Sequence, residues 1–176
     1  MKIVHLISGL NSGGAEKTLY KLVINDKKNE HIVISLKNGG IFKNKFEQNK
    51  ILNFSFNFQF NIFLIYEFFK LINLIKNLKP DLIQSWMYYS NFITIFIRLF
   101  YKVDIFWNIR ASFYKKFYSF ISRIVIYFTA LNSHFIPKKI IYCSNESIIN
   151  HEKIFYSNKK SILIPNGFSV FKKISF

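Results

Sequence analysis

The sequence is poor in cysteine, glycine, proline and acidic residues. Among 176 residues there are one cysteine, six glycines, three prolines and nine aspartates and glutamates. A single cysteine, Cys143, excludes a disulfide framework and a cysteine-built zinc site, which indicates a reducing compartment. Cys143 ends an apolar segment, so we interpret it as a small buried hydrophobic residue rather than a nucleophile. Since 51% of the residues are hydrophobic, intrinsic disorder is also excluded, and we expect one folded domain over residues 1–176.

Long uninterrupted apolar runs are also missing. A membrane-spanning helix needs about 20 mainly apolar residues, and charged residues interrupt every candidate. Asn61–Leu78 contains Glu67 and Lys70, Asn91–Tyr101 contains Arg98, and Phe117–Leu131 contains Arg123. The apolar run at the N-terminus is too short for a signal peptide. We therefore predict a cytoplasmic protein that can lie, as a peripheral protein, at the inner face of the cytoplasmic membrane.

Basic residues are abundant. There are 25 Lys and Arg against 9 Asp and Glu, which gives a formal net charge of +16. Only Arg98, Arg110 and Arg123 are arginines, while Ile, Asn, Lys and Phe make up roughly half of the chain. Because these four residues have codons rich in A and T, mutational bias explains both the charge and the phenylalanine content. No nucleic-acid recognition motif accompanies the charge, so we expect no nucleic-acid partner, whereas an attraction to an anionic membrane surface remains.

Short apolar segments rich in β-branched residues alternate with longer segments of helical period. The short segments suit strands buried on both faces of a parallel sheet. The alternation predicts an α/β fold, with a Rossmann-like, doubly wound parallel sheet in a three-layer α/β/α arrangement. The expected strands are Lys2–Ser8, His31–Leu36, Ile51–Phe54, Asp81–Ser85, Asp104–Ile109, Lys139–Ser144 and Ser161–Ile164. The expected helices are Ala15–Asp26, Phe42–Asn49, Asn61–Leu78, Tyr89–Tyr101, Phe113–Leu131 and Glu146–Tyr156.

Two of the expected helices carry further predictions. In Asn61–Leu78, apolar residues recur at spacings of three and four, which predicts a stripe that covers one sheet face. The stripe consists of Ile62, Ile65, Phe69, Ile72 and Ile75. The segment Phe113–Leu131 carries Lys115, Lys116 and Arg123 among aromatic residues. Either a half-buried helix or a contact with a membrane surface fits that pattern.

Polar and glycine-rich residues gather after the expected strands. In an open α/β sheet, ligands bind outside the carboxyl ends of the strands, and six such loops point to one edge. Gly13 and Gly14 lead into a helix, where uncovered backbone N–H groups and the positive helix end favour a phosphate. The loop lacks the dinucleotide and P-loop fingerprints. A plain strand-to-helix connection, with Glu16 favourable in the first turn, therefore fits it as well.

Other candidate binding residues follow the fourth and fifth strands. Arg110 ends the fifth strand, where anion binding and a surface ion pair both explain an arginine. Trp86, Tyr88 and Tyr89 follow the fourth strand, where aromatic rings either stack on a sugar or apolar tail or pack in the core. The four histidines have no metal-ligand spacing, so we expect no metal site.

Five short sequence segments occur in an order and at spacings that match those of a known protein family. Together they resemble the N-terminal domain of family-4 retaining glycosyltransferases of the GGAE type, which have the GT-B fold, and the similarity covers nearly the whole chain. The segments are His5–Lys17 with its Gly-Gly-Ala-Glu run, Lys79–Tyr88, Trp107–Arg110, Tyr142–Ser147 followed by His151 and Tyr156, and Ile164–Phe168.

The resemblance implies transfer of a sugar from a nucleotide-sugar to a cell-surface glycan or a lipid-linked acceptor, with no cofactor and no metal. It assigns the Gly13–Gly14 loop, with Glu16, to the donor phosphates. It assigns Trp86, Tyr88, Tyr89 and Arg110 to the acceptor side, and Ser144, Glu146, Asn166 and Gly167 to the floor of the cleft.

The sequence also departs from that family. Relatives commonly have histidine where this sequence has Tyr89 and Ala111, so the catalytic residue stays unknown. The family continues beyond the Pro-Asn-Gly segment into a donor-binding domain, which we expect to be absent here. One hypothesis is an acceptor-side domain, the single N-terminal half of a GT-B fold, that is inactive alone and needs a donor-domain partner chain. The other hypothesis is a non-enzymatic remnant, or a glycan- or lipid-binding module of the same fold.

Overall fold

Every strand of the sheet runs in the same direction. The strands are β1 (Lys2–Ile7), β2 (Glu30–Ser35), β3 (Leu52–Ser55), β4 (Leu82–Trp86), β5 (Asp104–Ile109), β6 (Lys139–Tyr142) and β7 (Ser161–Leu163). In the computed structural model, which describes residues 1–58, 62–114 and 118–167, they form one sheet in the order β3-β2-β1-β4-β5-β6-β7. Each neighbouring pair is parallel, so all seven predicted strands are confirmed.

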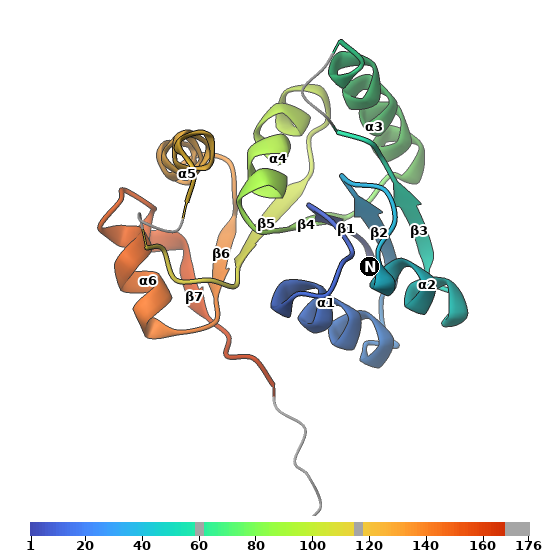
Figure 1. Ribbon diagram of the computed structural model, residues 1–176, viewed down its shortest axis with the longest axis horizontal. Helices are drawn as coiled ribbons and strands as arrows, with labels where there is room; N and C mark the ends of the chain where they lie inside the picture. Colours follow the sequence, from blue (N-terminus) through green and yellow to red (C-terminus); the bar gives the residue numbers. More distant parts are fainter. Residues whose placement is uncertain (59–61, 115–117, 168–176) are drawn as a thin grey trace, which may run out of the picture.

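Helices cover both faces of this sheet. They are α1 (Gly14–Asn25), α2 (Ile41–Gln48), α3 (Leu64–Leu78), α4 (Tyr88–Phe100), α5 (Phe120–Asn132) and α6 (Asn145–Glu152), and a 3₁₀ turn covers Asn158–Lys160. Right-handed crossovers place α1 and α2 on one face and α3, α4 and α5 on the other (Figure 1). Leu19 of α1 and Phe46 of α2 accordingly share one core cluster, whereas Ile72, Ile95 and Ile126 share the other. The α/β, doubly wound, three-layer class is confirmed.

Two helices differ from their predicted bounds by four residues or more, whereas the other four differ by one to three. The helix expected over Phe113–Leu131 begins at Phe120, because the Ser119 hydroxyl caps it by accepting a hydrogen bond from the Ser122 N–H at 3.2 Å. The helix expected to reach Tyr156 ends at Glu152, and three residues later Phe155 has a φ of 72°, which is incompatible with a helix. Asn61, Lys115 and Lys116 lie outside the described residues.

The stripe predicted for the third helix is half wrong. Ile72 and Ile75 are buried, but Ile62, Ile65 and Phe69 are 85%, 68% and 48% exposed. Periodicity alone identified the apolar side of the helix, yet only the C-terminal half of α3 packs on the sheet. In the N-terminal half, Phe68 packs against the core cluster, but Ile65, Tyr66 and Phe69 are exposed.

The loop after β1 lies against the loop after β2. The Phe42 N–H donates to the Leu10 carbonyl at 2.9 Å, and Gly40 turns the chain there with a φ of 112°. A Cβ atom on Gly40 would overlap the Leu10 carbonyl group. This contact supports the Gly-rich loop that leads to Gly13.

Candidate functional site

A hollow of about 270 Å³ lies at the carboxyl edge of the sheet, where β1 and β4 are neighbours. This is the point at which the strand order reverses: β1 leads to α1 on one face of the sheet, and β4 leads to α4 on the other. Open α/β sheets bind ligands at such a switch point. Gly14, Glu16 and Arg110, all identified from the sequence, meet here. The lining residues are Ile7, Ser8, Gly14, Ala15, Glu16, Met87 and Arg110.

The first turn of α1 opens into the hollow without a side-chain cap. Gly13 is the N-cap residue, and its backbone is extended, with φ −141° and ψ 169°. Any residue could adopt that conformation, so the missing side chain of Gly13 matters more than its flexibility. The Glu16 carboxylate lies where a Cβ atom on Gly13 would be. The uncapped N–H groups and the helix dipole favour an anion, and an incoming anion would displace this carboxylate.

Arg110 provides the positive charge of the hollow. One terminal guanidinium nitrogen donates to the Ile164 carbonyl at 3.0 Å and to Asn166 Oδ1 at 3.2 Å, and the other donates to Asn108 Oδ1 at 3.4 Å. These acceptors are neutral, and Arg110 makes no ion pair within the described ranges. Burial lowers the pKa of Arg110, although an arginine stays protonated in proteins. The surface ion pair that the sequence left open is therefore not formed among the described residues.

Trp86 packs against Arg110 and is fully buried. Its ring therefore packs in the core and is not accessible for stacking on a ligand. The Arg110 guanidinium carbon is 5.5 Å from the centre of the Trp86 ring. The indole N–H donates to His5 Nδ1 at 3.3 Å, and His5 Nε2 is therefore the protonated nitrogen that faces His31 Nδ1 at 2.9 Å. His31 Nε2 in turn lies 3.2 Å from the Asp26 carboxylate.

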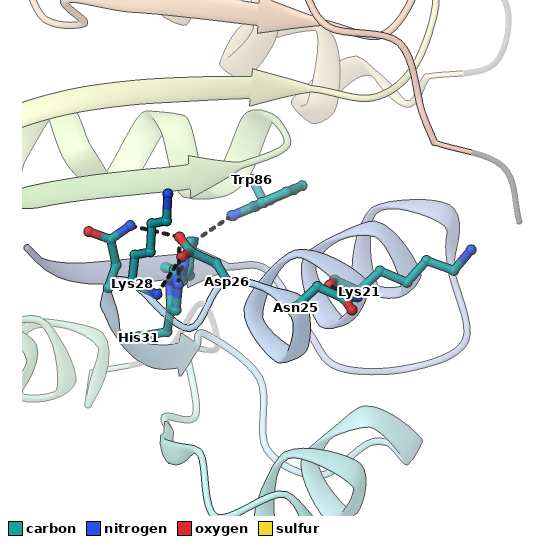
Figure 2. A network of polar contacts seen from close by, with 8 residues as sticks. Lys21, Asn25, Asp26, Lys28, His31 and Trp86 are labelled. Atoms are coloured by element: carbon teal, nitrogen blue, oxygen red, sulfur yellow. Dashed lines mark hydrogen bonds and ion pairs between the residues drawn. The ribbon is translucent and has the colours of Figure 1, made fainter.

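Figure 2 shows Trp86, His31 and Asp26 in this row of polar contacts. Burial, followed by the nearby His31, lowers the pKa of His5 to about 3. Hydrogen bonds from Asn29 and then from the Lys28 N–H lower the pKa of Asp26 to about 2. These contacts connect Asp26, at the C-terminal end of α1, to Trp86, whose ring packs against the Arg110 guanidinium. Within the described part of the chain, no three His, Cys, Asp or Glu side chains form a group suited to a metal ion.

Met87 is a site residue that the sequence analysis did not single out. It has a φ of 68° and a ψ of 171°, an unfavourable conformation for a non-glycine residue, and it joins β4 directly to α4. This sharp turn places its side chain in the lining of the hollow, where its sulfur accepts from the Arg110 N–H at 3.5 Å. Its position directly after a buried strand is the signal that could have identified it.

The remaining predicted site residues do not line the hollow. Tyr88 is buried, and its hydroxyl donates to His151 Nε2 at 2.8 Å. Tyr89 is exposed and its hydroxyl is 2.8 Å from the Ser122 hydroxyl. Ser144 caps α6 by accepting from the Ser147 N–H, the Glu146 carboxylate accepts from Tyr114, and Gly167 is exposed. Cys143 is only partly buried, because it lies beyond the end of β6. Four residues were predicted to form the cleft floor. In the described part of the chain, only Asn166 among them has a hydrogen bond to a lining residue, which is Arg110.

No protein-family profile and no curated protein matches the sequence. Its fold, however, matches solved structures. Alr3699/HepE from Anabaena in complex with UDP-glucose superposes with a TM-score of 0.81 at 18% identity, over 96% of this chain and 44% of that protein. The lipopolysaccharide outer core galactosyltransferase WaaB, in its apo form, has a TM-score of 0.69 at 12% identity, over 97% and 47% of the two chains. The S. aureus MnaA structure with UDP has a TM-score of 0.68 at 12% identity, over 92% and 44%.

The chain therefore has the fold of one half of these proteins and spans less than half of their length. The predicted single half of a GT-B fold is confirmed at the level of architecture.

Proposed function

We propose that this half of a GT-B fold is the acceptor-side domain of a family-4 retaining glycosyltransferase of the GGAE type. The complete enzyme, with its donor-binding half, would transfer a sugar from a nucleotide-sugar to a cell-surface glycan or a lipid-linked acceptor. The observation that carries the proposal is the hollow at the β1/β4 switch point, where the bare first turn of α1 and Arg110 line the same space. Neighbours solved with UDP or UDP-glucose support a nucleotide-sugar as the donor.

The chemistry of the hollow suits a diphosphate. Backbone N–H groups of the α1 turn donate to phosphate oxygens, and the Arg110 guanidinium, now bonded to neutral oxygens, can exchange those bonds for charged ones. In sugar transfer, the bond from the anomeric carbon to the phosphate oxygen breaks, and an acceptor hydroxyl oxygen bonds to that carbon and releases its proton. Donors aimed at the departing diphosphate stabilise the charge that develops on it. Among the acceptor-side residues, Tyr89 is open to a ligand, whereas Trp86 supports Arg110.

The phosphate role predicts weak UDP binding that depends on Arg110. In an NMR titration of the labelled protein with UDP, we expect the largest shifts at the amides of Gly14, Ala15 and Glu16. Arg110→Ala should weaken binding at least about tenfold, because a charge-assisted hydrogen bond contributes roughly 1.5–3 kcal/mol. Gly13→Val should weaken it as well, because its side chain would enter the space that the Glu16 carboxylate now occupies.

Arg98→Ala is the matched control, since the Arg98 guanidinium bonds to the Val103 carbonyl and does not line the hollow. It should leave UDP affinity unchanged. Uridine, which lacks phosphates, should not shift the α1 amides. Equal UDP affinity of Arg110→Ala and the unaltered protein would remove the hollow from the proposed function.

We predict that the purified 176-residue chain alone releases no UDP from UDP-glucose or UDP-galactose above background. A nucleotide held by one hollow keeps most of its surface in water, so the leaving group is poorly stabilised. Adding a donor-binding half as a partner chain should restore release. Turnover by the isolated chain would contradict this prediction, and UDP binding that no partner converts to turnover would favour the non-enzymatic module.

A further inference from the structure

A buried series of hydrogen bonds runs from the start of α4 through α6 to the segment after β5. The Tyr88 hydroxyl donates to His151 Nε2 at 2.8 Å. His151 Nδ1 lies 2.6 Å from the Ser147 carbonyl, and the Ser147 hydroxyl donates to the Ala111 carbonyl at 2.8 Å. Tyr88 is 4% exposed, and His151 and Ser147 are fully buried. We call Tyr88, His151 and Ser147 the α6 clamp, since two of its three members belong to α6.

Both ends of the α6 clamp adjoin residues that line the β1/β4 hollow. Tyr88 directly follows Met87, and Ala111 directly follows Arg110. The Arg110 N–H donates to the Met87 sulfur at 3.5 Å, which closes a ring of contacts between the two ends. Among the described residues, α6 contributes none to the lining of the hollow. The clamp can therefore act on the hollow only through the positions of Met87 and Arg110.

The hydrogen bonds of the clamp have a fixed direction. A backbone carbonyl can only accept, so the His151 proton lies on Nδ1, toward the Ser147 carbonyl, and Nε2 accepts from the Tyr88 hydroxyl. Burial raises the pKa of Tyr88 and lowers that of His151, so both groups stay neutral near pH 7. Apolar side chains of similar size would fill the same space, but paired polar groups hold their members in one arrangement.

The turn at Met87 explains why this part of the hollow needs support. Its φ of 68° and ψ of 171° cost a non-glycine residue free energy, and such a conformation persists only where surrounding contacts impose it. On one side of the turn, the Met87 N–H donates to the Asn108 carbonyl of β5 at 2.9 Å. On the other side, the first residue of α4 is Tyr88, which is bonded to α6. The strained turn is thus held between β5 and α6.

We propose that the α6 clamp fixes the Met87 turn and the Arg110 segment relative to each other, with His151 as its central positioning residue. A guanidinium that is held in place before a ligand arrives loses less freedom on binding. The clamp therefore strengthens the binding of a diphosphate by Arg110, although no clamp residue touches that ligand. This last step rests on the proposed function, whereas the positioning itself does not.

Amide hydrogen exchange of the ligand-free full chain tests the positioning. Tyr88→Phe keeps the ring but removes the hydroxyl, so we expect the Met87 and Arg110 amides to exchange about three to ten times faster. Tyr156→Phe is the matched control, since Tyr156 is also buried, at 3% exposed, and its hydroxyl lies 2.6 Å from that of Thr129 instead. Both variants lose one buried hydroxyl, so a change in global stability affects them alike. The control should leave the two amides unchanged.

The UDP titration tests the consequence for the hollow. Tyr88→Phe should weaken UDP binding about threefold or more, whereas Tyr156→Phe should bind UDP as the unaltered protein does. A glutamine at position 151 can still accept at one end and donate at the other, but a leucine can do neither. His151→Gln should therefore bind UDP more tightly than His151→Leu.

The outcomes separate the positioning from the proposed function. Equal exchange of the Arg110 amide in Tyr88→Phe and Tyr156→Phe would overturn the positioning role. Equal UDP affinity of these two variants, in a chain that binds UDP, would overturn the link between the clamp and the ligand. Faster exchange in Tyr88→Phe, together with no UDP binding by the unaltered chain, would support the clamp and contradict the proposed function.

Discussion

Lowering the pH from about 7.5 to about 5 is expected to reduce the free energy of unfolding by about 4 kcal/mol, roughly half from His5 and half from His151. Burial lowers the pKa of His5 to about 3 and that of His151 to about 4. Below its usual pKa of 6.5, each histidine binds a proton in the unfolded chain but stays neutral in the fold. Stability is therefore complete above pH 6.5 and decreases as the pH falls through this window.

The contacts explain why neither histidine accepts a second proton. His5 Nδ1 accepts the Trp86 N–H, which can only donate, so a proton on Nδ1 would set two donors against each other. His151 Nε2 accepts the Tyr88 hydroxyl, and burial disfavours the charged imidazolium there. The proton of His151 stays on Nδ1, which faces the Ser147 carbonyl at 2.6 Å. Asp26, with a pKa lowered to about 2, remains ionised throughout and does not contribute in this window.

Urea denaturation followed by tryptophan fluorescence measures the effect, since Trp86 and Trp107 are both fully buried. His151→Gln should remove about half of the pH dependence. His134→Gln, at an exposed position, should leave the pH dependence intact. A double variant, His5→Gln with His151→Gln, that still loses the full stability at low pH would contradict the assignment to these two groups.

Gly40→Ala is expected to destabilise the protein by about 3 kcal/mol or more, which lowers the melting temperature by about 10 °C. Gly40 has a φ of 112° and a ψ of 152°, a region that essentially only glycine occupies. A Cβ atom there would also meet the backbone carbonyl of Leu10, which has no freedom to move aside because it accepts the Phe42 N–H.

Two other glycines at the carboxyl edge of the sheet, Gly39 and Gly14, serve as controls. Gly39 has a φ of 75° but open space around it, so Gly39→Ala should cost only about 1 kcal/mol. Gly14 lies in the first turn of α1, also with open space, and Gly14→Ala should be neutral or slightly stabilising. Thermal unfolding of the three variants gives the comparison. Equal melting temperatures for Gly40→Ala and Gly39→Ala would show that the Leu10 contact yields.

The candidate site was predictable in part. The rule that ligands bind at the carboxyl ends of strands identified Gly14, Glu16 and Arg110 from their positions after β1 and β5. The same rule grouped Tyr88 and Glu146 with them, yet these side chains bond to His151 and Tyr114 and do not line the hollow. Strand order predicts which loops share an edge, but the direction of a side chain depends on the helix it belongs to.

The sequence by itself determined the seven strands, the alternation with helices and hence the α/β class, because hydrophobic periodicity and turn residues act over a few neighbouring positions. It did not determine that the edge strands β3 and β7 contain no buried residue. Only the tertiary structure decided which residues meet. The burial of Trp86 below Arg110, the turn at Met87 and the exposed sides of α3 and α5 all depend on contacts between distant segments. A local pattern shows which side of a helix is apolar, but whether that side is covered depends on how far the sheet beneath it extends.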